Sequence, residues 1–127
     1  MAHQHHVLIA DDDLAFRWAL AVRCYRRKLE VDVAENGHEA LDLVTKRLGQ
    51  YCCIILDLKM PRHDGTAVLD MLSASASAPP VVVVTGYPDA LEDMVSKAKQ
   101  GLVAETLLKP VDVDVVISAA EKHCAHA

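Results

Sequence analysis

Five polar residues follow apolar segments of this chain, and together they suit the binding of a cation and a phosphoryl group. They are Asp11, Asp12, Asp57, Thr85 and Lys109. An aliphatic run that ends in a polar residue is typical of a buried strand that reaches the edge of a sheet. In an open parallel sheet, the C-terminal strand ends lie along one edge, where such folds bind their ligands. We therefore expect three carboxylates, a hydroxyl and an amine in one shallow site.

Clustered carboxylates favour a bound cation, because like charges raise one another's pKa unless a positive charge neutralises them. Oxygen ligands favour a hard ion, and Mg²⁺ takes one or two carboxylates together with waters and phosphate oxygens. A carboxylate such as Asp57 can also attack phosphorus and form an aspartyl phosphate. Lys109 offers a point charge and Thr85 a hydroxyl donor for the phosphoryl oxygens. The residue set therefore predicts phosphoryl chemistry that depends on Mg²⁺.

The elements that must position these residues alternate between strands and helices. Strands are predicted at 7–10, 30–34, 52–56 and 81–85, with a short fifth strand that ends at Lys109. Helices are predicted from Leu14 to Leu29, from Asn36 to Gly49, from Asp64–Gly65 to Leu72, from Pro88–Asp89 to Gly101, and from Asp112 onwards. Asp13 is expected to cap the first helix. Its predicted apolar face consists of residues that recur at helical spacing, namely Leu14, Trp18, Ala21, Val22, Tyr25 and Leu29.

The composition of the strands predicts their order. Strict alternation of strand and helix gives a parallel sheet covered on both faces. The first, third and fourth strands are continuous apolar runs, as strands buried on both faces are. The second alternates polar and apolar residues and the fifth is short, so both belong at the edges. We therefore predict an α/β fold of the flavodoxin-like (βα)5 type, a three-layer sandwich with strand order 2-1-3-4-5.

These motifs, in this order, resemble a response-regulator receiver domain, as in the bacterial chemotaxis regulator. The resemblance rests on Asp11-Asp12 after an apolar run, Asp57 within 56–65, Thr85-Gly86 and Lys109-Pro110. Each motif alone is weak, and their combination is specific. The resemblance covers the chain from Val7 to the last helix. It implies a flexible polar N-terminus at 1–6, a receiver domain at 7–127, and phosphoacceptor function in a two-component phosphorelay that controls a partner or an output domain.

The resemblance also implies the roles of the carboxylates. Asp57 would accept the phosphoryl group from a sensor histidine kinase or a histidine phosphotransfer protein. Asp12 and Asp57 would bind Mg²⁺ directly, Asp11 would act through water, and the backbone carbonyl of Lys59 would be a further ligand. The side chain of Lys59 also stands at a position that tunes the lifetime of the phosphorylated form.

The remaining implied roles concern the switch. Lys109 would contact the phosphoryl group, Thr85 would be the switch hydroxyl, and the bond to Pro110 is expected to be cis, which only a bond preceding proline adopts cheaply. Tyr87 resembles a second tuning position, and we expect it to shield the acyl phosphate from water. The family usually has Tyr or Phe three residues before the lysine, but this chain has Thr106 there. The familiar relay from threonine to an aromatic ring therefore lacks its aromatic partner.

Two other functions remain open at this point. A degenerate receiver would bind partners without phosphorylation. An aspartyl-nucleophile phosphatase of the haloacid-dehalogenase-like type would use Asp57, but those enzymes usually carry a second Asp where this chain has Lys59. The leading prediction is not an enzyme acting on a metabolite, because the domain would catalyse only its own phosphorylation and dephosphorylation.

Composition limits the partners. The net charge is −5, and the one basic cluster, Arg23 with 26–28, is expected at the end of the first helix, where it complements the helix dipole. Nucleic acid is therefore not an expected partner. No apolar run is long enough to cross a bilayer, and no signal peptide is recognised, so we expect a cytoplasmic bacterial signalling protein. The output partner is expected on the face formed by the fourth helix, the fifth strand and the last helix. Whether the receiver stands alone or belongs to a larger regulator stays open.

The cysteines and the N-terminal histidines are not predicted to take part in the chemistry. Cys52 and Cys53 are interpreted as small buried hydrophobic residues, not as a disulfide, and Cys24 and Cys124 fall in predicted helices. This usage fits a reducing cytoplasm. Three histidines lie within residues 1–6. We expect this segment to be loose, with weak metal binding as the alternative.

Overall fold

Five parallel strands form one sheet in the order β2-β1-β3-β4-β5, as predicted. The structure is a computed structural model and describes residues 5–60, 65–75, 77–86 and 102–124. The strands are β1 (His6–Ala10), β2 (Glu30–Ala34), β3 (Cys53–Leu56), β4 (Val81–Thr85) and β5 (Val103–Leu108). The helices are α1 (Leu14–Arg26), α2 (Gly37–Arg47), α3 (Gly65–Ser73) and α5 (Val113–Cys124), with a 3-10 turn at Leu48–Gln50.

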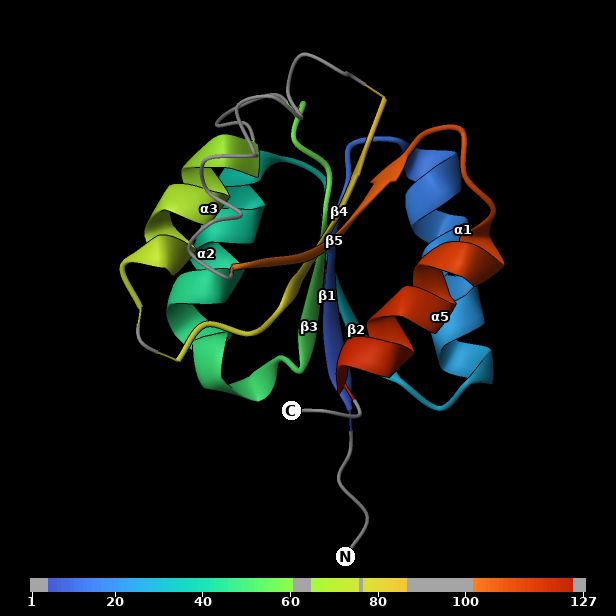
Figure 1. Ribbon diagram of the computed structural model, residues 1–127, viewed down its shortest axis with the longest axis horizontal. Coiled ribbons are helices and arrows are strands. Elements are labelled where there is room, and N and C mark those ends of the chain that lie inside the picture. The colour runs from blue at the N-terminus through green and yellow to red at the C-terminus, as the bar shows by residue number, and fades with distance from the viewer. Residues whose placement is uncertain (1–4, 61–64, 76, 87–101, 125–127) are drawn as a thin grey trace, which may run out of the picture.

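Helices cover both faces of the sheet (Figure 1). α2 and α3 lie on one face, and α1 and α5 lie on the other. The helix predicted at 88–101 lies outside the described residues. No helix within the described ranges is long and apolar enough to cross a membrane.

The strands at the centre of the sheet are buried on both faces. Every residue of β3 and β4 is buried, and β1 is buried from its second residue onwards. Leu8 and Ile54 pack toward α2 and α3, whereas Ile9 and Ile55 pack toward α1 and α5. Because alternate side chains of each strand serve two separate cores, the strand ends are held in fixed register.

The edge strand β5 is longer than predicted. It has six residues and starts at Val103, and its side chains alternate between half-buried and exposed. Glu105 and Thr106 interrupt the apolar run, which is why the sequence predicts only a short strand before Lys109. A strand at the edge tolerates such polar residues because one of its faces is only partly covered.

The buried face of α1 differs in part from the predicted one, since Ala21 and Leu29 pack against the core as expected but the larger residues do not. Leu14, Trp18 and Tyr25 are 68%, 69% and 80% exposed, whereas Leu20 and Cys24 are fully buried. Two stripes of this helix have apolar spacing, and the one with the smaller residues faces the core. The basic cluster at the end of α1 helps to fix the rotation of the helix about its own axis, because the arginines of the cluster pair with acidic residues of α5. The ion pairs join Arg23 to Asp114, and Arg27 to Asp114 and Glu121.

The helix caps follow the sequence closely. Asp13 caps α1, and its carboxylate accepts the backbone N–H of Phe16 at 3.2 Å. Asn36 accepts the N–H of Glu39 at 2.9 Å, and the Glu39 side chain accepts the N–H of Glu35 at 2.9 Å. These bonds satisfy N–H groups that lack intrahelical partners, and they fix where α1 and α2 leave the sheet.

A disulfide joins Cys52 and Cys124, which corrects the prediction that no cysteine has chemistry. Cys52 directly precedes β3 and Cys124 ends α5, and their Cα atoms lie 4.9 Å apart across a sequence separation of 72 residues. Cys53 is a buried free thiol, as predicted, and Cys24 is a buried free thiol within α1, the helix in which it was expected. The sequence does not reveal the pair because only the return of α5 along the sheet brings its last residue beside the start of β3.

Candidate functional site

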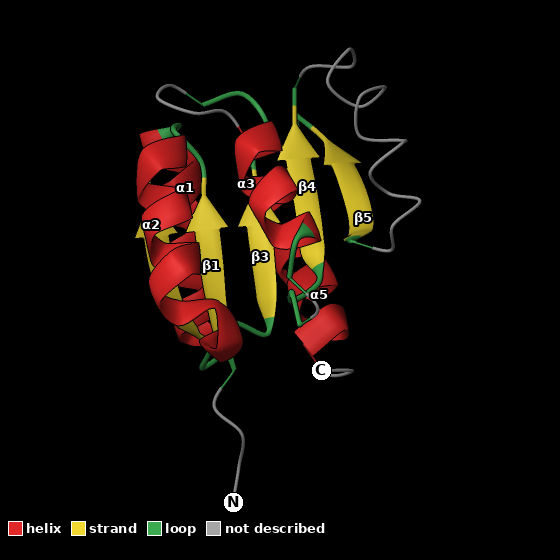
Figure 2. Ribbon diagram, turned by 90° about the vertical axis from the view of Figure 1, so that its left-hand side faces the viewer, coloured by secondary structure: helices red, strands yellow, loops and turns green. Residues whose placement is uncertain are grey.

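The strand arrowheads all point toward one edge of the sheet (Figure 2), and the predicted polar residues lie at the ends of the strands or directly after them. Backbone hydrogen bonds extend the strand pairing into this edge. The N–H of Asp57 donates to the carbonyl of Ala10 at 2.9 Å, and the N–H of Lys109 donates to the carbonyl of Thr85 at 2.8 Å. The backbone at Asp57 and Lys109 is therefore positioned by the sheet itself.

Three carboxylates form the centre of the site. Asp11, Asp12 and Asp57 each offer an oxygen within 4.8 Å of the others. Asp11 is 2% exposed and Asp57 is 5% exposed, whereas Asp12 is exposed. The cluster thus has a buried base and one side open to solvent, so it is accessible to an ion and to a phosphoryl donor.

Lys109 bridges the two buried carboxylates. Its Nζ lies 2.8 Å from Oδ2 of Asp11 and 3.2 Å from Oδ2 of Asp57. The ammonium also lies 4.8 Å from the centre of the Phe16 ring, at a distance suited to a cation–π contact. Two carboxylates and one ring thus fix the amine where its charge would meet a phosphoryl group on Asp57.

Burial makes the two inner carboxyl groups of the cluster costly to ionise. Burial raises the pKa of Asp11, against the hydrogen bond from Lys109. Burial, and then the charge of Asp11, raises the pKa of Asp57. Burial alone would lower the pKa of Lys109, but its hydrogen bond to Asp11 and the two carboxylate charges raise it. An added cation would remove the cost of ionising both carboxyls.

The backbone around Asp57 is held closely. Oδ1 of Asp57 accepts the N–H of Lys59 at 3.1 Å, while the N–H of Gly65 donates to the carbonyl of Leu58 at 2.7 Å. A Cβ at Gly65 would lie 2.4 Å from the carbonyl oxygen of Asp57 and 2.7 Å from the Cα of Leu58. Only glycine fits here, so α3 begins in direct contact with the backbone of Asp57.

The remaining predicted residues lie around the same edge. Thr85 is fully buried at the end of β4, and the Lys109–Pro110 bond is cis. Thr106 is exposed on β5. Tyr87 lies outside the described residues, so its predicted shielding role stays a prediction.

Sequence reasoning did not identify three supporting residues. Phe16 contacts Lys109, the Nη1 of Arg17 donates to the backbone carbonyl of Asp11 at 2.8 Å, and Gly65 accommodates Asp57. Phe16 and Arg17 lie one turn beyond Asp12 and Asp13, so the first turn of α1 brings them back to the site. That spacing is the signal that could have indicated them.

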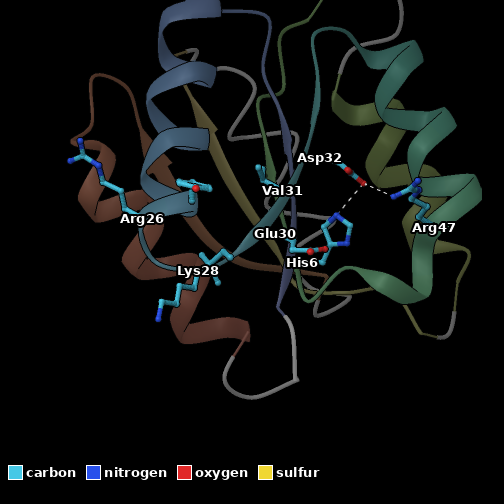
Figure 3. A pocket seen from close by; sticks show the side chains of 9 residues that line it. His6, Arg26, Lys28, Glu30, Val31, Asp32 and Arg47 are labelled. Atoms are coloured by element: carbon cyan, nitrogen blue, oxygen red, sulfur yellow. Dashed lines mark hydrogen bonds and ion pairs between the residues drawn. The ribbon is translucent and has the colours of Figure 1, made fainter. Parts of the chain in front are cut away.

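A separate hollow lies away from the carboxylate cluster (Figure 3). It has a volume of about 790 Å³ and lies where β1 and β2 begin. Its lining residues are His6, Tyr25, Arg26, Lys28, Leu29, Glu30, Val31, Asp32 and Arg47. His6 and Arg47 both contact Asp32, at 3.2 and 3.4 Å. Since opposite charges pair within this hollow, the carboxylate cluster remains the stronger functional candidate.

Comparisons with known proteins show which family this chain resembles. A family model described as the response regulator receiver domain matches residues 7–121. The DNA-binding transcriptional regulator NtrC of Klebsiella pneumoniae is 30% identical over 118 residues, which cover 93% of this chain and 24% of that protein. The sporulation initiation phosphotransferase F of Bacillus subtilis is 29% identical over 92% of this chain and 91% of its own length. This chain thus spans about a quarter of the matched NtrC regulators.

Solved structures agree with the sequence matches. The receiver domain of the Francisella response regulator 1452 has a TM-score of 0.84 and 26% identity, covering 97% of this chain and 98% of that one. A Burkholderia pseudomallei response regulator with a phosphorylated aspartic acid, a calcium ion and citrate has a TM-score of 0.77 and 26% identity. That match covers 97% of this chain and 70% of the other.

Proposed function

The chain belongs to the family of response regulator receiver domains, and we propose that it accepts a phosphoryl group on Asp57 as part of a two-component phosphorelay. Receiver domains are signalling modules that interact with histidine kinases or phosphotransferases, and they typically turn over no metabolite. One observation carries the proposal. Lys109 bridges Asp11 and Asp57 at the buried base of a three-carboxylate cluster.

The cluster fits Mg²⁺, because its donors are carboxylate oxygens within 4.8 Å of one another and both buried carboxyls are costly to ionise without a cation. Asp12 and Asp57 would hold the ion directly, Asp11 through water, together with the backbone carbonyl of Lys59. When bound, Mg²⁺ supplies positive charge that offsets the carboxylates and the phosphoryl oxygens.

In the proposed reaction, the Asp57 carboxylate attacks the phosphorus of a phosphohistidine. A P–O bond forms, the P–N bond breaks, and the imidazole nitrogen leaves with the electron pair and takes a proton from solvent. Lys109 then directs its ammonium to the phosphoryl oxygens, and Thr85 donates its hydroxyl to one of them. Hydrolysis reverses the modification: water attacks phosphorus, the acyl P–O bond breaks, and phosphate leaves. Lys59 and Tyr87 are proposed to set the rate of this last step.

The exposed face of α1 is proposed to receive the phosphodonor protein. Leu14, Trp18 and Tyr25 are large, apolar and mostly exposed, and Leu14 follows the acidic residues directly. Exposed apolar residues gathered on one helix are typical of a protein interaction surface. A donor bound here would lie next to the open side of the carboxylate cluster, and we place this exchange in the bacterial cytoplasm.

The output surface is proposed to include β5 and α5, together with the helix predicted at 88–101. A hollow of about 380 Å³ lies between β5 and α5, and Glu105, Asp114 and Val115 contribute to its lining. Val115 is 49% exposed and Leu108 is 50% exposed. With Thr106 in place of an aromatic residue, we propose that phosphorylation acts on this surface through Thr85 and the segment that follows it.

Intact-mass analysis tests the proposal directly. The protein is incubated with acetyl phosphate in the presence and absence of Mg²⁺, beside an Asp57→Asn control. We expect one added phosphoryl group that requires Mg²⁺ and disappears in the control. Beryllofluoride, a stable phosphoryl mimic, detects a phosphorylated form that hydrolyses too fast for mass analysis. If neither reagent modifies or binds the protein, the proposal is wrong and a phosphorylation-independent interaction module becomes the better explanation.

A further inference from the structure

A second cluster of potential ligands lies at the opposite edge of the sheet from Asp57. His5, Cys52 and Cys124 each offer a nitrogen or sulfur atom within 4.8 Å of the other two. Cys52 lies five residues before Asp57, which is about 16 Å along an extended strand. The two clusters are therefore separate sites at the two ends of β3.

Backbone hydrogen bonds hold His5 and Cys52 beside each other. The carbonyl of His5 accepts the N–H of Glu30 at 2.8 Å, and the N–H of Cys52 donates to the carbonyl of His6 at 2.8 Å. The backbone of His5 and His6 is thus held between β2 and the start of β3. His6 turns the other way and contacts Asp32 at 3.2 Å (Figure 3). Successive side chains of an extended chain point to opposite faces, which leaves His5 on the side of the two cysteines.

The third ligand comes from the far end of the chain. Cys124 is the last residue of α5 and is 2% exposed. α5 packs over the same face of the sheet as α1, and Cys52 packs against that core. The position of Cys124 is therefore set by the packing of the whole helix, and it does not depend on the disulfide alone.

We propose that reduction of the Cys52–Cys124 disulfide opens a Zn²⁺ site in which His5, Cys52 and Cys124 are the protein ligands. Thiolate sulfur and imidazole nitrogen are the donors that zinc prefers, and three protein ligands leave a fourth position for water or another molecule. Zn–S bonds of about 2.3 Å and Zn–N bonds of about 2.0 Å place tetrahedral ligand atoms roughly 3.5–3.8 Å apart. The nitrogen of His5 already lies within 4.8 Å of both sulfurs. The two sulfurs, which are bonded to each other in the disulfide, must move apart after reduction to complete the site.

The disulfide and the zinc site exclude each other, because both use the same two sulfur atoms. A thiolate of a dithiol reductant attacks one sulfur, the S–S bond breaks, and a mixed disulfide forms. The second thiol of the reductant resolves it, so the reductant is oxidised to its own disulfide and the protein gains two thiols. Zn²⁺ then replaces the two thiol protons, which are released to solvent. Since cytoplasmic disulfides are usually transient or redox-sensing, the proposed zinc form is the one for reducing conditions.

The other two cysteines differ in environment. Cys24 and Cys53 are fully buried, and burial raises the pKa of their thiols to about 11 and about 12. A thiol must lose its proton to bind zinc, so these two are poor ligands. His5 is only partly buried, which gives an ion access from the surface. Cys24 therefore provides a matched control: it is a cysteine of the same core without a place among the ligands.

Cobalt and zinc titrations of the full chain test the proposal. Co²⁺ bound to thiolates absorbs through sulfur-to-cobalt charge transfer, whereas Co²⁺ on the carboxylates of the other site does not. After reduction with a phosphine, we expect one Co²⁺ per chain with this absorption, displaced by Zn²⁺. The oxidised protein and the Cys52→Ser variant should lack the absorption. His5→Ala should weaken affinity by at least about tenfold, and Cys24→Ala should bind as the wild type does.

Counting free thiols tests the disulfide separately from the zinc site. Alkylation under denaturing conditions should modify all four cysteines after reduction and two after oxidation. Zn²⁺ should slow the oxidation of the reduced protein. The proposal is overturned if the reduced protein shows no thiolate absorption with Co²⁺, if Cys52→Ser retains it, or if oxidation leaves four alkylated cysteines. None of these outcomes depends on phosphorylation of Asp57.

Discussion

Replacing Gly65 by alanine should damage both stability and the phosphoacceptor site. The new Cβ would lie 2.4 Å from the carbonyl oxygen of Asp57 and 2.7 Å from the Cα of Leu58. Ordinary van der Waals contact begins at 3.4 Å, so the two segments must separate by about 1 Å. Both clashing atoms belong to the backbone, and a side-chain rotation therefore cannot relieve the contact.

The size of the effect follows from two costs. Overpacking a close contact costs about 1–3 kcal/mol, and weakening the hydrogen bond from Gly65 N–H to the Leu58 carbonyl costs about 1 kcal/mol more. The better helix propensity of alanine offsets up to about 1 kcal/mol. We therefore expect the free energy of unfolding to fall by about 2–3 kcal/mol, which lowers the Tm by roughly 8–12 °C in a domain of this size.

Gly49→Ala is the matched control, because a Cβ at Gly49 meets no atom within 4 Å. It should leave the Tm unchanged or raise it slightly. Thermal unfolding gives the stability of both variants, and labelling with acetyl phosphate and Mg²⁺ reports on Asp57. Gly65→Ala should be labelled more slowly even well below its Tm. If it matches Gly49→Ala in both assays, the close contact between α3 and Asp57 is not a real constraint and the reasoning fails.

Three further predictions concern charge, positioning and docking. Because the pKa values of Asp11 and Asp57 are raised in the folded protein without metal, its free energy of unfolding should fall as the pH rises above about 4. Asp57→Asn should make the free energy of unfolding less dependent on pH. It should also stabilise the metal-free protein at neutral pH by on the order of 1 kcal/mol, as measured by urea unfolding. A steeper pH dependence in the variant would contradict the prediction. Phe16→Ala should slow acetyl phosphate labelling about two- to fivefold, with Phe16→Leu as the packing control, and equal rates in both variants would argue against the cation–π contact. Trp18→Ala should leave acetyl phosphate labelling unchanged but slow transfer from a phosphorylated histidine kinase at least about tenfold, and an unchanged transfer rate would remove α1 from the proposed docking surface.

The sheet and the position of the carboxylates could be predicted because they depend on local patterns. A run such as Val81–Thr85 is apolar throughout only when both faces are buried, so its place in the centre of the sheet follows from composition. Asp11 and Asp57 then meet because parallel strands end at one edge. These inferences need only two facts: side chains alternate between the two faces of a strand, and the strands run parallel.

The features that could not be predicted depend on how elements pack. α1 has two apolar stripes, and pairing of its arginines with α5 exposes Trp18 and buries Leu20. The disulfide between Cys52 and Cys124 depends on where α5 ends in space. The contact between Phe16 and Lys109 likewise requires the first turn of α1 to lie next to the residue that follows β5.

The bridge from Lys109 to Asp11 and Asp57 has a consequence for how the domain responds to its surroundings. The amine acts as an internal counter-ion that occupies the same electrostatic niche as a metal ion. A cation that enters the site would have to compete with this amine, so we expect a modest metal affinity and fast exchange. Under the proposed function, metal occupancy would then follow the free ion concentration until a phosphodonor arrives.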